Sequence, residues 1–197
     1  MACIPKDEIK RKSFHLLSLL YIFGYWYLSK NIVIFGLIVV MIIVVLLEYI
    51  RFKLSKVNDF FKNNFKGFYR FEEVRKVSGL IWTLSGAFIA IVLFPNKSIV
   101  FVSLLCFAFG DTVAALVGRG IGRHKIFTNK SLEGSFACFI VCFIIGLFFF
   151  NIQFALIGAI SATLTEAIFW KLSDNFWMQI INTGILTAAS SVIAWAK

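Results

Sequence analysis

An aspartate, Asp111, interrupts an apolar run of the chain shortly before three glycines at alternate positions, Gly118, Gly120 and Gly122. A carboxylate inside an apolar membrane segment is costly to keep and marks a functional site by default. Glycines beside cations at a helix end suit phosphate, because backbone N–H groups and positive charge gather there. The stretch 109–136 therefore predicts a site for a phosphate-bearing ligand.

The residues around these glycines define the ligands that we expect. The glycine cluster does not follow a strand, and no G-x-x-x-x-G-K-[ST] loop is present, so neither standard nucleotide fingerprint applies. Phosphates would instead meet loop amides and cations, together with a magnesium ion held by carboxylates. The expected phosphate or nucleotide contacts are Gly118, Arg119, Gly120, Gly122, Arg123, Lys125, Lys130, Ser131 and Gly134.

Four acids are candidates for metal binding and catalysis. Asp111 is the strongest candidate for a metal ligand, and Glu133, Glu166 and Asp174 are weaker candidates. Two alternatives stay open: Asp111 pairs structurally with a lysine or arginine, and Glu133 caps the helix that follows it, where a negative charge is favoured. Asn129, Asn175 and Phe127 are available to contact a nucleotide base.

A second group of ionisable residues lies near the N-terminus. Glu8, Arg11, Lys12 and His15 follow at i, i+3, i+4 and i+7, so they share one stripe of a helix that continues into an apolar run. A simple interfacial anchor explains part of this pattern. A carboxylate, two cations and an imidazole exceed what an anchor needs, so we interpret Arg11 and Lys12 as part of the site.

The composition indicates the environment in which these groups lie. Of 197 residues 60% are hydrophobic, and the mean hydropathy of +0.88 is too high for a soluble domain of this length. All but three of the 20 basic residues, Lys30, Lys97 and Lys197, fall in segments expected on the cytoplasmic side. The net charge of +10 therefore reflects the orientation of the chain in the membrane, and no nucleic-acid partner is expected. The four cysteines are scattered and form no disulfide or zinc pattern.

Seven apolar runs are long enough to be membrane helices, which predicts an all-α polytopic membrane protein of one domain, 1–197. Six helices are possible because the first and fifth runs are short. Between the second and third runs, Ile50, Leu54, Val57, Phe61, Phe65 and Phe68 recur at helical spacing among lysines and asparagines, which predicts an interfacial amphipathic helix. The seven runs are 14–28, 32–50, 77–94, 99–117, 134–150, 152–170 and 176–195.

Stripes of small residues predict which helix faces pack together, because small side chains let helices approach closely in lipid. Two of these stripes contain an acid, so Asp111 and Glu166 should face the interior of the bundle. The stripes are Gly79, Thr83, Gly86 and Ala90; Ala108, Asp111, Ala115 and Gly118; and Ala155, Ala159, Ala162 and Glu166. No repeat with paired broken helices is present, which weakens a transporter interpretation.

Together these motifs resemble the CTP-dependent lipid kinases, a family that includes dolichol or polyprenol kinase, phytol kinase and CTP-dependent diacylglycerol kinase. The resemblance implies a lipid alcohol substrate, CTP as phosphate donor and a divalent metal, and it implies sensitive positions at Arg11, Lys12, Asp111 and Gly118. The motifs are Glu8-x-x-Arg11-Lys12-x-x-His15, Glu48-x-x-Arg51, Glu73 before Ser78-Gly79, Phe94-Pro95, Gly110-Asp111 with Ala114-Ala115 and Gly118-Arg119, Lys130-Ser131-x-Glu133-Gly134, and Glu166 before Asp174-Asn175.

The central block also resembles the phosphatidate cytidylyltransferases, which make CDP-lipids. Those enzymes end in a P-G-H-G-G-x-x-D-R-x-D-S signature, whereas the late polar block here is only Ser173-Asp174-Asn175. The kinase interpretation is therefore preferred, with a CDP-lipid synthase and a non-enzymatic transporter or scaffold as alternatives. The lipid alcohol and the oligomeric state are not determined by the sequence.

The expected mechanism places CTP at the cytoplasmic mouth of the bundle, in the cell membrane or the endoplasmic reticulum. Magnesium held by Asp111, with Glu133 or Asp174, bridges the phosphates of CTP. Cationic side chains neutralise charge as the γ-phosphoryl group moves to a lipid hydroxyl; these are Arg11, Lys12 and Lys130. Glu166 or Asp174 is the expected base, with His15 a weaker candidate.

Overall fold

The computed structural model describes residues 4–64, 77–127, 130–168 and 173–193. Within these ranges the regular secondary structure is helical except for one short hairpin, so the all-α expectation is confirmed. The elements are α1 (Lys6–His15), α2 (Ser18–Tyr27), α3 (Lys30–Lys53), α4 (Ser55–Asn64), α5 (Gly79–Leu93), α6 (Lys97–Leu105), the π-helix η2 (Cys106–Gly110), α7 (Asp111–Gly120), β1 (Lys125–Phe127), β2 (Lys130–Ser131), α8 (Leu132–Phe149), α9 (Ile152–Ala167) and α10 (Asp174–Ser190).

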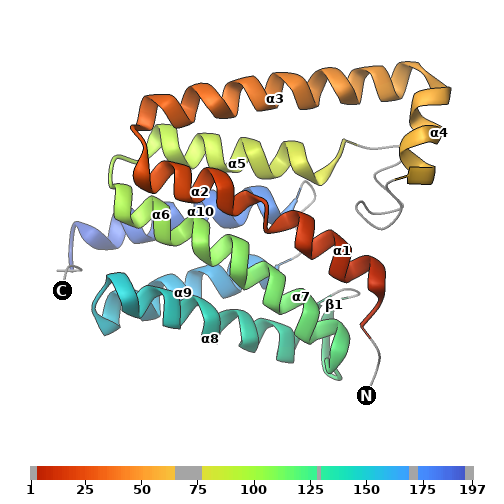
Figure 1. Cartoon of the computed structure of the whole chain (residues 1–197). Coiled ribbons are helices and arrows are strands. Elements are labelled where there is room, and N and C mark those ends of the chain that lie inside the picture. Colours follow the sequence, from red (N-terminus) through yellow and green to blue (C-terminus); the bar gives the residue numbers. More distant parts are fainter. Residues whose placement is uncertain (1–3, 65–76, 128–129, 169–172, 194–197) are drawn as a thin grey trace.

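The central element is the continuous helical stretch Lys97–Gly120, formed by α6, η2 and α7. Helices α8 and α9 pack together beside it, α10 bridges α9 and α5, and α3 packs on α5 at the outside of the bundle (Figure 1). Close helix approach depends on the predicted small residues. A Cβ on Gly86 would lie 2.8 Å from Gln179 Nε2, and one on Gly146 would lie 2.9 Å from Ala155 Cβ.

Three helical stretches in the described ranges are long and apolar enough to cross a membrane: α3, Lys97–Gly120 and α8. Helices α5 and α9 are also apolar but have only 15 and 16 residues. A helix needs about 20 residues to cross a hydrocarbon core of about 30 Å. The structure thus fits an integral membrane protein, and the count of seven spans stays a prediction.

Two sequence expectations need correction. The expectation of one helix over 14–28 is wrong, because α1 ends at His15 and α2 begins at Ser18. The loop after α7 also contains an antiparallel pairing of β1 with β2, which the sequence did not indicate.

The predicted interfacial helix is present in part. Helix α3 ends at Lys53, and α4 contains Val57 and Phe61 of the predicted apolar stripe. Phe65, Phe68 and Glu73 lie outside the described residues.

Candidate active site

A π-helical turn places Asp111 in the centre of the bundle. The turn η2 ends at Gly110, directly before Asp111, and short π-helical segments are frequent at functional sites. Only 6% of Asp111 is exposed, and Glu166 on α9 is exposed to 3%. Both acids therefore face the interior, as the small-residue stripes predicted.

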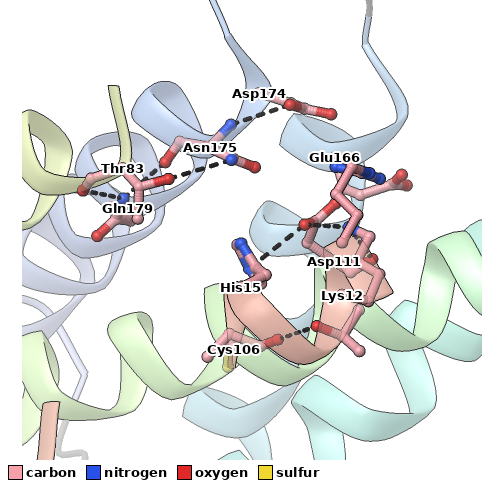
Figure 2. A network of polar contacts seen from close by, with 12 residues as sticks. Lys12, His15, Thr83, Cys106, Asp111, Glu166, Asp174, Asn175 and Gln179 are labelled. Atoms are coloured by element: carbon pink, nitrogen blue, oxygen red, sulfur yellow. Dashed lines mark hydrogen bonds and ion pairs between the residues drawn. The ribbon is translucent and has the colours of Figure 1, made fainter. Parts of the chain in front are cut away.

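The N-terminal helix supplies the partners of Asp111. Lys12 Nζ lies 2.5 Å from Asp111 Oδ2 and also donates to the Asp111 backbone carbonyl at 3.0 Å. His15 Nε2 lies 3.4 Å from the same carboxylate oxygen, so both side chains point at Asp111 from α1 (Figure 2). Burial lowers the pKa of Lys12 below its ordinary value, and the Asp111 carboxylate opposes that fall. The structural pairing left open for Asp111 is thus present.

Lys130 joins two further acids. Its Nζ donates to Glu166 Oε1 at 2.5 Å and to Asp174 Oδ2 at 2.8 Å, and so links β2 to α9 and α10. Glu166 also accepts a hydrogen bond from Ser135 at 3.3 Å. Burial disfavours the charged ammonium, but the surrounding carboxylates, Asp174 first among them, outweigh this effect and raise the pKa of Lys130.

A third ion pair lies beside these. Arg11 contacts Glu8 at 2.6 Å on the same helix, and Arg119 at the end of α7 lies 3.5 Å from Glu8. Burial alone would raise the pKa of Glu8, but Arg11, together with Arg119 and Lys12, outweighs burial and holds this pKa below its ordinary value. The stripe predicted on α1 is therefore confirmed as one face that meets α7.

These charged side chains surround a small polar cavity of about 30 Å³. Such a volume holds a water molecule or an ion of similar size. The cavity lies where α1, α7, β2, α8, α9 and α10 meet. Its polar lining consists of Glu8, Arg11, Asp111, Arg119, Lys130, Ser131, Ser135, Glu166 and Asp174.

The predicted glycines pack the loop tightly against the helices. A Cβ on Gly122 would lie 2.3 Å from the Gly118 carbonyl oxygen, and one on Gly118 would lie 2.9 Å from Ser131 Oγ. A Cβ on Gly134 would meet the Ala114 carbonyl oxygen at 2.6 Å, so α7 and α8 cross at backbone contact. Ser131 itself is buried and caps α8 by accepting from the Gly134 amide.

Glu133 contacts the loop, and the structure does not bring it to the Asp111 cavity. Its carboxylate accepts from the backbone amides of Arg123 and His124 at 3.0 and 3.2 Å, and it lies 2.8 Å from His124 Nδ1. Arg123 and Lys125 are exposed on this loop, and Arg119 is exposed at the end of α7. The loop therefore presents cations to the solvent next to the buried cluster.

A neutral polar network lies next to the charged one, and its contacts were not predicted from the sequence. Asn175 Nδ2 donates to Thr83 Oγ1 at 3.1 Å, and Gln179 Nε2 donates to the Thr83 carbonyl at 3.0 Å (Figure 2). Gln179 and Thr83 are polar residues within apolar helices, and this was the signal available in the sequence. Of the candidate base-contacting residues, Phe127 is exposed and Asn129 lies outside the described residues.

A much larger apolar groove adjoins the polar cavity. It has a volume of about 800 Å³ and runs between α1, α2, α3, α5 and the start of α10. Arg11 and Asp174 line both the groove and the polar cavity. A ligand in the groove and a ligand in the polar cavity would therefore meet at these two side chains.

The carboxylates of the polar cavity are the groups that would hold a magnesium ion. Asp111, Glu166 and Asp174 offer carboxylate oxygens, the donors that magnesium prefers. In the part of the chain that the structure describes, no three His, Cys, Asp or Glu side chains form a metal cluster. Magnesium ordinarily needs only one or two carboxylates, with substrate phosphates and water completing its shell.

Several curated proteins resemble this chain, and lipid kinases are among them. A CTP-dependent diacylglycerol kinase 1 of Saccharomyces cerevisiae is 29% identical over 94% of this chain and 74% of its own length. The CTP-dependent diacylglycerol kinase 1 of Eremothecium gossypii is 29% identical over 91% of this chain and 66% of its own. Dolichol kinase sec59 of Schizosaccharomyces pombe is 44% identical over 45 residues, 22% of this chain and 9% of its own. No protein-family model and no solved structure matches.

Proposed function

We propose that this chain, which belongs to the CTP-dependent lipid kinase family, transfers the γ-phosphoryl group of CTP to the hydroxyl of a membrane lipid alcohol. The observation that carries the proposal is the junction of a charged cavity with an apolar groove at Arg11 and Asp174. Phosphoryl transfer between a nucleotide and a lipid needs these two environments in contact, because one reactant is charged and the other is apolar.

The cations in and around the charged cavity support the binding of phosphate groups there. Lys12 and Lys130 are buried next to carboxylates, and Arg11 and Arg119 border the same cavity. The cavity of about 30 Å³ is too small for a triphosphate. CTP therefore binds with its phosphates along the exposed loop of Arg123 and Lys125, and its γ-phosphate displaces lysine contacts within the cavity.

Positioning and charge supply most of the catalysis in phosphoryl transfer. Arg11 and Lys12 neutralise charge on the transferring group, and Asp174 orients the lipid hydroxyl because it lines the groove as well as the cavity. Asp111 and Asp174 would hold magnesium. A bound magnesium ion supplies positive charge that offsets the charge developing on the phosphate oxygens.

A cytoplasmic location of the site is supported by the charge at one end of the bundle. The start of α1, the end of α3, α4 and the loop after α7 all lie at that end (Figure 1). Basic residues there include Arg51, Lys53 and Arg123, whereas Lys30 and Lys97 begin helices at the opposite end. This asymmetry follows the positive-inside pattern, in a chain that we treat as one domain over 1–197.

The direct test incubates the detergent-purified protein with lipid alcohols and CTP labelled at either the γ or the α phosphate. Lipid that carries γ label, with release of CDP, supports the kinase. Lipid that carries α label, with release of pyrophosphate, identifies a CDP-lipid synthase instead. Transfer of neither label, together with no thermal stabilisation by CTP and magnesium, would favour a non-enzymatic transporter or scaffold.

A further inference from the structure

The apolar groove follows one face of α3 along almost its whole length. Lining residues on α3 begin at Ile32 and end at Arg51, and intermediate ones recur about one helical turn apart at Gly36, Val40, Val44 and Leu47. Nineteen residues of helix correspond to about 28 Å. The groove is therefore about as long as the hydrocarbon core of a bilayer is thick, which is about 30 Å.

Polar groups gather at one end of this groove. Arg11, His15, Asp174, Asn175 and Thr83 line it where it adjoins the charged cavity. The Glu48–Arg51 ion pair, at 2.6 Å, borders the same end from α3. Apart from Ser18 and Tyr21 on α2, the lining towards the beginning of α3 consists of apolar side chains and glycine. The groove is thus built for a molecule with one polar head and a long apolar remainder.

Two glycines in the apolar part leave space that no side chain fills. A Cβ added to Gly24 on α2 or to Gly36 on α3 would meet no atom within 4 Å, and both residues line the groove. Gly86, Gly110 and Gly146 are instead in tight contact with neighbouring atoms. Gly24 and Gly36 are therefore not explained by helix packing.

The position of Gly36 on α3 shows how far this space lies from the polar end of the groove. Gly36 precedes Arg51 by 15 residues, or about 22 Å of helix. One leaflet accounts for half of the hydrocarbon core, or about 15 Å. A chain that passes Gly36 therefore extends beyond the leaflet in which its head group lies.

We propose that the groove holds the hydrocarbon chain of the acceptor lipid, and that Gly24 and Gly36 admit an acceptor with a chain longer than one leaflet, as in a polyprenol. This inference rests on the proposed function and names the acceptor class of the same site. A diacylglycerol has acyl chains that end within one leaflet, so it would use only the half of the groove nearest Asp174.

The test fills the deep half of the groove with Gly36→Leu. The matched control is Val45→Leu, because Val45 lies nine residues from Gly36 and hence on the opposite face of α3, where it is 49% exposed and does not line the groove. Size-exclusion chromatography and circular dichroism check that both variants fold. Gly24→Leu provides a second variant on the opposite wall.

Acceptors of three kinds are compared with γ-labelled CTP: farnesol, undecaprenol and dioleoylglycerol. We expect undecaprenol to be the preferred acceptor of the unaltered protein. Gly36→Leu should lower kcat/KM for undecaprenol by about tenfold or more, the factor for losing roughly two buried methylene groups. It should leave farnesol and dioleoylglycerol within about twofold, and Val45→Leu should change none of the three.

The outcomes separate this inference from the proposed function. If the unaltered protein transfers γ label but prefers dioleoylglycerol, or if Gly36→Leu leaves undecaprenol phosphorylation unchanged, the inference is overturned and the kinase stands. If no alcohol is phosphorylated, the proposed function fails, and native mass spectrometry of the delipidated protein with undecaprenol then tests the groove. If the unaltered protein retains undecaprenol and Gly36→Leu loses it, the inference is supported. Equal retention of undecaprenol by both proteins overturns it.

Discussion

Two helical stretches of 24 residues, α3 and Lys97–Gly120, have opposite surroundings. The most apolar window of α3 has a mean hydropathy of 3.0 and only 17% of its residues are buried, whereas the window of Lys97–Gly120 has a hydropathy of 2.2 and 78% burial. In lipid the more apolar helix lies outside, because acyl chains solvate its side chains. The less apolar helix lies inside, where it places a carboxylate among small residues.

Length and apolarity thus identify a membrane helix but not its role. Helix α3 has charged residues only near its ends and forms a wall of the apolar groove. The stretch Lys97–Gly120 contains Asp111 in its middle and contacts elements from both halves of the chain. Substitutions in or against the inner stretch should therefore lower the stability of the protein strongly, and equivalent ones in α3 should lower it little.

The largest effect on stability should follow from Lys12→Met, which removes the cation from the buried Asp111. Breaking one partner of a buried ion pair typically costs on the order of 3–5 kcal/mol, because the remaining charge is left uncompensated. Chemical denaturation in detergent measures this loss. The control is Lys12→Met combined with Asp111→Asn, which should recover most of it. If Lys12→Met alone is as stable as the unaltered protein, the Lys12–Asp111 ion pair is not buried as described.

A smaller loss of stability should distinguish the same substitution, glycine to alanine, in the two helical stretches. Gly110→Ala places a Cβ 2.8 Å from Cys142 Sγ and 3.0 Å from Cys138 Sγ, so overpacking should cost about 1–3 kcal/mol. Gly36→Ala meets no atom within 4 Å, and alanine is the better helix former, so no loss is expected. Thermal unfolding of both variants measures the difference, and equal losses would contradict the contrast between the helices.

The smallest of these effects should come from Glu133→Gln on the loop next to the inner stretch. Because Glu133 holds the amides of Arg123 and His124, its loss should raise the KM for CTP by roughly tenfold and leave kcat nearly unchanged. Initial rates at varied CTP and magnesium measure both constants. A collapse of kcat with an altered magnesium requirement would identify Glu133 as a metal ligand instead.

The sequence predicted the parts of the fold that depend on local composition. Each of the seven apolar runs contains helix, and the small residues around Asp111 and Glu166 correctly placed both acids inside. The break between His15 and Ser18 was not predictable, because no proline or glycine marks it. There α1 contacts α7 and α2 contacts α6, so tertiary packing sets the boundary.

Partner choice and the groove could not be predicted from the sequence. Lys12 is separated from Asp111 by 99 positions, and Lys130 from Glu166 and Asp174 by 36 and 44. Nothing in the chain distinguishes Lys12 as the partner of Asp111, or Lys130 as the link between the other two acids. The open space at Gly24 and Gly36 likewise depends on the positions of three helices. The ionisable residues themselves were identified because charge in an apolar chain is rare.

The account depends on Asp111 acting in phosphoryl transfer, and one measurement tests this most directly. The transfer of γ label from CTP to a lipid alcohol is compared between the unaltered protein and Asp111→Asn at equal folded yield. The account predicts that the variant retains less than about a tenth of the activity, because asparagine keeps the shape of the side chain and removes its charge. Activity well above about a tenth would contradict the account.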